Sequence, residues 1–187
     1  MIISDLIECD LVRGAIVNKI EENSASVDID VEYFSGDEID LEKMLNLAVD
    51  DYYKALKLGN TPKAIDNLVL INRGNNKFSI YLIELKDVNK LRRLCVDDIK
   101  EKYQTTINDF MINRYGESFN NDAYKLIDFN IWLVCNKFRF LDSDISSEDY
   151  EKKIENTFIE RLLMIKPFKY KNKLSQITPM YPRAQID

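Results

Sequence analysis

Three charged residues stand at spacings that suit chemistry on a phosphate group. Asp66 precedes the apolar run Leu68–Ile71, and Glu84 and Lys86 end the next such run along the chain. Because side chains alternate between the two faces of a strand, Glu84 and Lys86 share one face while Leu85 points to the other, into the core. If the two runs pair, two carboxylates and one ammonium group meet at one end of a sheet.

Such a set suits the hydrolysis of a phosphodiester bond. Two carboxylates can hold Mg²⁺, which prefers oxygen ligands, polarises the scissile phosphate and lowers the pKa of a bound water. Lys86 would orient the attacking water or neutralise the developing charge. The composition agrees, because the 187 residues include no histidine, which excludes Ser-His-Asp and Cys-His catalysis and every histidine-dependent metal centre. The five glycines are too dispersed for a phosphate-cradling loop.

The stretch between the two runs predicts a β-hairpin. Asn72-Arg73-Gly74-Asn75-Asn76 has the composition of a turn between two β-rich segments. In an antiparallel hairpin the start of the first strand lies beside the end of the second. The turn is therefore expected to fold Glu84 back to within reach of Asp66.

The remaining elements predict an α/β (α+β) fold, with a small mixed β-sheet flanked by helices. Amphipathic patterns predict helices over Ile3–Ile20, Leu41–Leu58, Val88–Tyr115 and Glu148–Lys166, and the apolar patterns predict strands over Ser26–Phe34 and within Leu126–Phe138. We expect one domain over residues 1–187, with its core at about 41–138. A helix and a strand (1–35) would precede this core, and a helix and a basic, irregular tail (148–187) would follow it.

The residues around the predicted hairpin resemble a known family. Ile65-Asp66 and Glu84-Leu85-Lys86 resemble the motif of the PD-(D/E)xK phosphodiesterases, which include most Type II restriction endonucleases, with Ile65 in place of the family's proline. The [DE]-x-K pattern also occurs at Asp98-Ile99-Lys100 and Glu151-Lys152-Lys153, but both lie in predicted helices. The apolar strand ahead of Glu84 and the paired Asp66 single out the first occurrence.

The resemblance implies a fold, a site and a cofactor. It implies a restriction-endonuclease-like core over about residues 41–138, and catalysis by Asp66, Glu84 and Lys86 with Mg²⁺ bound to Asp66 and Glu84. Many members add an acidic residue from the helix before the hairpin, and some carry a glutamine on the helix after it. The candidates here are Glu42, followed by Asp50 and Asp51, and Gln104.

Size and charge suggest a narrower class within this family. The net charge is −6, whereas a protein that grips double-stranded DNA alone is usually basic, since phosphate neutralisation supplies most of the affinity. After the core is allotted, little chain is left to read bases. The chain resembles the small cleavage subunit of a heterodimeric Type IIS restriction endonuclease. This resemblance implies a larger DNA-recognising subunit that nicks one strand of a non-palindromic site, and weak activity without that partner.

Two alternatives remain open. One is a self-sufficient nuclease of the same class: a homodimeric restriction enzyme, a repair nuclease or a Holliday junction resolvase. The other is an acidic, non-catalytic protein that binds a nuclease or mimics DNA. The 32 acidic residues allow the second alternative, but 26 basic residues are interspersed with them, whereas a mimic should show denser acidic clustering.

Other features of the sequence carry weaker signals. Four lysines, interleaved with Phe168 and Tyr170, could contact phosphates or form a solvated tail: Lys166, Lys169, Lys171 and Lys173. Arg92 and Arg93 could touch a phosphate backbone or simply lie on an exposed helical face. Three scattered cysteines (Cys9, Cys95 and Cys135) favour buried thiols in a reducing cytoplasm. No apolar run is long enough to span a membrane, and the N-terminus has no signal-like basic region.

Overall fold

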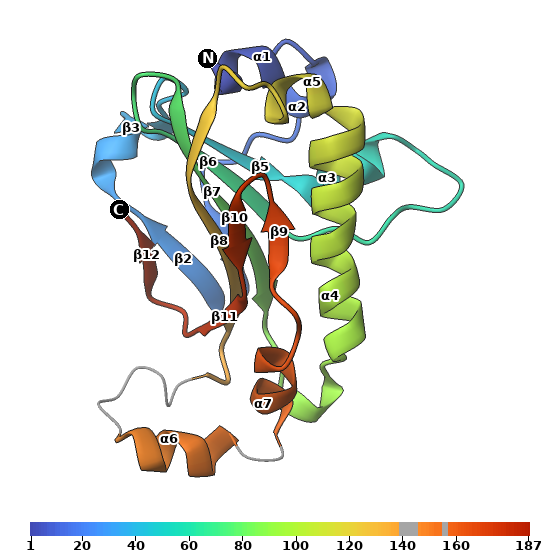
Figure 1. The fold of residues 1–187 in the computed structure, drawn as a ribbon, viewed down its shortest axis with the longest axis vertical. Helices are drawn as coiled ribbons and strands as arrows, with labels where there is room; N and C mark the ends of the chain where they lie inside the picture. The colour runs from blue at the N-terminus through green and yellow to red at the C-terminus, as the bar shows by residue number, and fades with distance from the viewer. Residues whose placement is uncertain (139–145, 155–156) are drawn as a thin grey trace.

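The computed structural model describes residues 1–138, 146–154 and 157–187. Its centre is a mixed five-stranded sheet in the order β11-β8-β7-β6-β5 (Figure 1). The strands are β5 (Met44–Ala48), β6 (Asn67–Asn72), β7 (Lys77–Lys86), β8 (Lys125–Cys135) and β11 (Ile177–Met180). The pairs β5–β6 and β6–β7 are antiparallel, whereas β7–β8 and β8–β11 are parallel.

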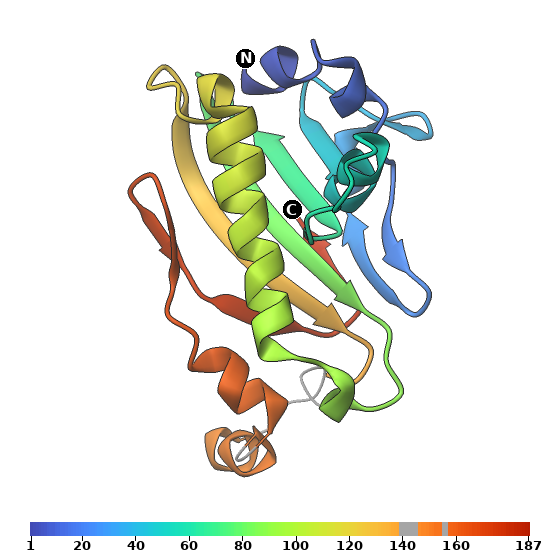
Figure 2. The same ribbon diagram turned by 90° about the vertical axis from the view of Figure 1, so that its right-hand side faces the viewer.

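Helices cover one face of this sheet. The longest is α4 (Val96–Thr105), which continues as the π-helix η3 (Thr106–Arg114) and crosses the sheet (Figure 2). Shorter helices complete the layer: α1 (Ile2–Leu6), α2 (Asp10–Arg13), α3 (Val49–Ala55) and α5 (Gly116–Phe119). Two further helices, α6 (Ser147–Ile154) and α7 (Phe158–Leu163), follow β8. None of the helices within the described residues is long and apolar enough to cross a membrane.

A second, smaller sheet covers the opposite face. It has the order β1-β2-β12, from β1 (Ile20–Glu22), β2 (Ala25–Ile29) and β12 (Ala184–Ile186). Two short hairpins and two 3₁₀ turns complete the fold: β3 (Phe34–Ser35) with β4 (Glu38–Ile39), β9 (Phe168–Tyr170) with β10 (Lys173–Ser175), η1 (Val31–Tyr33) and η2 (Leu91–Arg93).

The alternation of side chains along β7 separates two hydrophobic cores. Ile80 and Leu82 belong to the larger core under the helices, while Ile83 and Leu85 belong to the smaller core under the second sheet. The prediction that Leu85 points away from Glu84 into a core is therefore confirmed. The central sheet is buried on both faces, as the near-continuous apolar runs of β6 and β7 require.

The hairpin is confirmed, and its turn has the backbone that its residues favour. Gly74, Asn75 and Asn76 all have positive φ, at 72°, 50° and 57°. Glycine and asparagine tolerate this left-handed region best. The Asn72 side chain accepts a hydrogen bond from the Gly74 amide at 3.0 Å, which stabilises the turn.

The predicted helix over Leu41–Leu58 is wrong in its first half. Met44–Ala48 forms the edge strand β5, and only Val49–Ala55 is helical. Leu45 and Leu47 pack in the larger core under the helices, and Met44 packs in the smaller core, which is the alternation of a strand. In the sequence alone, a short apolar run is compatible with either a strand or a helix. Within this strand the buried Asn46 side chain donates to the carbonyls of Val17 and Lys19, which ties the N-terminal segment to the sheet.

Three other predicted helices differ in extent. The first breaks into α1 and α2, and β1 begins at Ile20. The helix after the motif begins at Val96 rather than Val88. The carboxylate of Asp87, which precedes the predicted start, accepts hydrogen bonds from Ser24 and Asn136 and does not cap a helix. The helix expected from Glu148 comprises α6 and α7, with residues 155–156 outside the described part of the chain.

The predicted irregular tail after Pro167 is also wrong. This segment supplies β9 to β12, with β11 parallel to β8 in the central sheet and β12 parallel to β2 in the smaller one. Parallel pairing with strands far away in sequence leaves no local signature. The cysteines are unpaired, but only Cys135 is fully buried, and Cys95 is exposed, so the expectation of three buried thiols holds in part.

Candidate active site

The register of the central sheet brings the predicted acidic pair together. Asn67 pairs with Ile83 at the end of the β6–β7 ladder, so extending the register by one residue sets Asp66 opposite Glu84. Directly opposed residues on an antiparallel pair have their Cβ atoms about 5 Å apart on the same face. The sequence prediction that these two carboxylates converge is therefore confirmed.

Glu84 is fully buried at the centre of this cluster. Its side chain is 0% exposed. Its Oε1 atom is 2.6 Å from the Lys102 Nζ and also forms an ion pair with the Lys86 ammonium group. Its Oε2 atom is buried and has no hydrogen-bond partner among the described residues. An unsatisfied carboxylate oxygen is costly to bury, so a ligand bound at this atom would stabilise the folded protein.

Asp66 lies at the edge of the cluster, about a quarter exposed. Its Oδ2 accepts a hydrogen bond from the Leu85 amide at 2.7 Å, and its Oδ1 lies 3.9 Å from the Lys102 Nζ. The backbone just before it is anchored to the helix layer, because the Ile65 amide donates to the Thr106 hydroxyl at 3.3 Å. One Asp66 oxygen is thus held by the motif strand, and the other faces a cation.

Lys102 is the residue that sequence reasoning missed. It projects from α4 and links both carboxylates, at 2.6 Å from Glu84 and 3.9 Å from Asp66. The helical spacing of the apolar residues around Lys102 could have indicated it. Ile99, Tyr103 and Thr106 face inward from the helix, and Lys102 falls on the same face at three residues after Ile99 and four before Thr106. A lysine on an inward face indicates a buried acidic partner.

The surroundings of Glu84 favour its neutral, protonated form. Burial, and secondly the neighbouring Asp66 carboxylate, raise the pKa of Glu84 to about 7 although two lysines oppose this shift. Burial lowers the pKa of Lys86, but the Glu84 carboxylate outweighs burial, so that the pKa of Lys86 lies above its ordinary value. Additional positive charge at this point would stabilise ionised Glu84.

An acidic cleft opens beside Asp66. Five carboxylates and two lysines line it: Glu21 and Glu22 from β1, Asp50 and Asp51 from α3, Asp66, Lys19 and Lys54. Lys54 forms ion pairs with Asp50 at 2.8 Å and with Asp51 at 2.9 Å. We refer to this surface as the acidic cleft.

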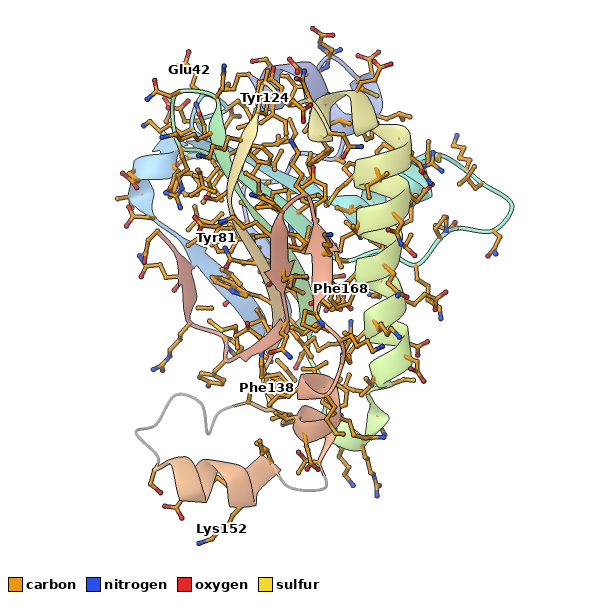
Figure 3. The ribbon with its side chains drawn as sticks, viewed as in Figure 1. Glu42, Tyr81, Tyr124, Phe138, Lys152 and Phe168 are labelled. Atoms are coloured by element: carbon orange, nitrogen blue, oxygen red, sulfur yellow. The ribbon has the colours of Figure 1, made fainter. Side chains whose placement is uncertain are left out.

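Glu42 does not belong to the site, and its assignment was wrong. It is exposed and lies before β5, which pairs through Met44 with Ile71 at the turn end of the hairpin. Its carbonyl accepts a hydrogen bond from the Asn72 side chain at 2.8 Å. Figure 3 shows Glu42 at the end of the molecule opposite Phe138, which follows the strand end paired with Lys86. The first half of the predicted helix is a strand, and the acidic residues at the start of the helix α3, Asp50 and Asp51, line the acidic cleft.

The other weak candidates also lie elsewhere. Gln104 is exposed and lines a different groove, on the outer side of α4. Arg92 and Arg93 are exposed on the 3₁₀ turn η2. Phe168 and Tyr170 are buried in the larger core, so neither aromatic ring can stack on a base.

The donor set at the motif fits a magnesium ion held in part by other ligands. Mg²⁺ commonly binds through one or two carboxylates and keeps several waters or substrate phosphates. The carboxylates of Asp66 and Glu84 meet this requirement, and the Oε2 atom of Glu84 has no hydrogen-bond partner among the described residues. Within the described residues no group of three or more carboxylate or cysteine side chains could enclose a metal ion by itself. A metal here would therefore need water or substrate to complete its coordination.

No family model matches the sequence, no curated protein is significantly similar to it, and no solved structure matches its fold. The geometry of the motif and of the surfaces around it is therefore what points to a function.

Proposed function

We propose that this chain is a Mg²⁺-dependent endonuclease that hydrolyses phosphodiester bonds of DNA, with a restriction-endonuclease-like core. The observation that carries the proposal is the convergence of Asp66, Glu84 and Lys86 at the open end of the β6–β7 hairpin, with Glu84 fully buried. Burial of a carboxylate costs several kcal/mol unless it is compensated. Retaining one inside an apolar strand favours a functional role over a structural one.

Each residue of the cluster has a role in this reaction. Asp66 and Glu84 would hold Mg²⁺, which when bound supplies positive charge against the scissile phosphate. The Lys86 ammonium group, anchored by Glu84 and by a hydrogen bond to the Leu85 carbonyl at 3.0 Å, would orient the attacking water and balance the charge that develops on phosphate oxygens. Asp50, which lines the acidic cleft beside Asp66, would add negative charge near the metal without being a third ligand.

We further propose that the chain is the small, one-strand-cutting subunit of a heterodimeric Type IIS restriction endonuclease. Supporting this, the surface beside the motif is acidic and the net charge is −6, so a chain that acted alone would repel DNA near its own cleavage centre. A larger subunit that reads the site would supply the missing affinity and deliver one strand to this motif. The function would then be type II site-specific DNA cleavage within a restriction-modification system.

Metal binding can be tested without any partner. Titration of Mg²⁺ or Mn²⁺ at pH 8 should raise the thermal unfolding midpoint of the wild-type chain, since a ligand that binds only the folded state stabilises it. The increase should disappear in Glu84→Gln and remain in Glu42→Gln, the matched control at the other end of the sheet. Equal stabilisation of both variants would contradict a metal site at Glu84.

Cleavage is tested with plasmid DNA and Mg²⁺, with and without a candidate large subunit that nicks one strand of an asymmetric site. Nicking that becomes double-strand cutting only when the wild-type chain is added, and not with Glu84→Gln, would support the subunit role. Cutting by the chain alone, strongly dependent on concentration and directed at a palindrome, would identify a homodimeric nuclease instead.

The acidic, non-catalytic protein remains the rival of another class. The observation that favours it is that the ammonium groups of Lys86 and Lys102 already balance the charges of Glu84 and Asp66, without a metal ion. A folded wild-type chain that neither binds divalent metal nor cuts DNA with any partner, yet binds a nuclease, would replace our proposal with this one.

A further inference from the structure

A second groove lies on the outer side of α4, and its charge is opposite to that of the acidic cleft. Its polar and basic lining comes from α4 and η3 and from the segment that leads into β9: Lys100, Gln104, Asn108, Lys166 and Lys169. None of the described residues that line it is acidic. Figure 2 shows α4 crossing the sheet between α3 on one side and the β9–β10 hairpin on the other. We refer to this surface as the basic groove.

The strand β9 explains why lysines rather than aromatic rings face this groove. Its side chains alternate, so that Phe168 and Tyr170 are buried while Lys169 is exposed. Lys171, just beyond the strand, is held away by hydrogen bonds from its ammonium group to the carbonyls of Asn121 and Tyr124, both at 3.0 Å. The mixed basic and aromatic pattern in the sequence therefore separates into a core face and a charged surface.

The three lysines of the groove differ from other lysines of α4 and its surroundings. Lys63 forms ion pairs with Asp98 and Glu101, both at 2.9 Å, and Lys102 with Glu84. Among the side chains that the structure describes, no ion pair involves Lys100, Lys166 or Lys169. In a chain of net charge −6, three lysines that line one groove and form no ion pair among the described side chains favour a site for an anion supplied from outside.

We propose that the basic groove binds the phosphodiester backbone of DNA. Lys100, Lys166 and Lys169 would neutralise successive phosphates, and the Gln104 and Asn108 amides would donate hydrogen bonds to phosphate oxygens. Among the described residues no exposed aromatic ring lines the groove, so it lacks a platform on which unpaired bases could stack. The identity of the ligand as DNA rests on the proposed nuclease function, and sequence-independent contacts are what a subunit needs when its partner reads the site.

Binding can be measured without cleavage. The parent protein is Glu84→Gln, which is studied in EDTA so that no DNA is cut. Fluorescence anisotropy with a 30-base-pair duplex at low salt measures the DNA affinity of this parent and of the same protein with Lys100→Ala/Lys166→Ala/Lys169→Ala. We expect the triple variant to bind about tenfold more weakly. The slope of log affinity against log salt should fall by about 2 to 3, since each lysine–phosphate contact contributes about 0.9. The matched control is Lys43→Ala/Lys77→Ala/Lys125→Ala, which removes the same charge from exposed positions at the turn end of the sheet. It should change the affinity less than twofold.

The outcomes separate this proposal from the nuclease assignment. Equal losses in the two triple variants, or unchanged binding in the groove variant, would overturn the basic groove as a DNA site. Failure of the parent to bind any DNA at low salt would also overturn it, and would leave an acidic protein surface as the occupant to test. If the wild type cuts DNA while the groove variant binds and cuts equally well, only the groove proposal fails. If the groove variant alone loses binding but the wild type never cuts, only the nuclease proposal fails.

Discussion

The acidic cleft and the basic groove lie on either side of α4. They differ in whether their charged side chains form ion pairs. In and beside the acidic cleft, carboxylates meet lysines at short range: Lys54 lies 2.8 Å from Asp50, and Lys102 lies 2.6 Å from Glu84. In the basic groove, three lysines share a lining in which none of the described residues is acidic. The comparison shows that a net charge of −6 averages over surfaces of different local charge, and it is the local uncompensated charge that attracts a ligand.

The two surfaces should also separate catalysis from binding, and this is the largest effect we expect. Asp66→Asn should lower the rate of DNA cleavage by at least about a thousandfold, since it weakens cation binding at the reacting phosphate, while leaving DNA affinity unchanged. Lys166→Ala/Lys169→Ala should raise the DNA concentration for half-maximal cleavage with little change in the rate at saturation. Single-turnover cleavage over a range of DNA concentrations measures both quantities. A shared pattern in the two variants would show that the surfaces act as one.

The burial of Glu84 should make metal-free stability fall as the pH rises. The carboxyl ionises near 4.5 in the unfolded chain and near 7 in the folded one, so between these values the unfolded state holds fewer protons and gains relative to the native state. In EDTA, wild type should lose up to about 3 kcal/mol relative to Glu84→Gln between pH 4.5 and pH 8. Urea unfolding of both proteins across this range measures the difference. Parallel curves of stability against pH for the two proteins would show that burial does not raise the pKa of Glu84.

Lys102 should compete with a divalent cation for Glu84. Its ammonium group lies 2.6 Å from Glu84 and 3.9 Å from Asp66, so Lys102→Met should tighten Mg²⁺ binding about tenfold by removing a positive charge a few ångströms away. Lys100→Met is the matched control, because Lys100 lies two residues earlier on the same helix but faces the basic groove. The midpoint of metal-dependent thermal stabilisation measures the affinity. Weaker binding in Lys102→Met would instead make Lys102 part of the site that a bound metal needs.

Glu42 should contribute nothing measurable. Glu42→Ala removes an exposed side chain from the turn end of the sheet, so the cleavage rate should stay within about twofold and stability within about 0.5 kcal/mol. Asp50→Asn, in the acidic cleft, should lower the cleavage rate more than Glu42→Ala does. The same cleavage assay compares the two, and the reverse order would return the helix-borne acidic role to Glu42.

The sequence by itself determined the hairpin and the acidic pair. Gly74, Asn75 and Asn76 favour positive φ, and a tight antiparallel turn fixes which residues oppose each other, so Asp66 and Glu84 meet through local rules alone. The apolar run of β8 likewise predicts a buried strand because its burial leaves a continuous hydrophobic signature.

Tertiary structure decided the rest, because the deciding contacts lie far apart in the chain. Met44–Ala48 is a strand only because β6 offers it an edge, and the segment after Pro167 is ordered only because β8 and β2 accept parallel partners from it. Lys102 reaches Glu84 because α4 crosses the sheet directly over the end of β7. Periodicity in the sequence can say that a side chain faces inward, but which carboxylate it meets depends on how helix and sheet pack, and that depends on the whole buried surface.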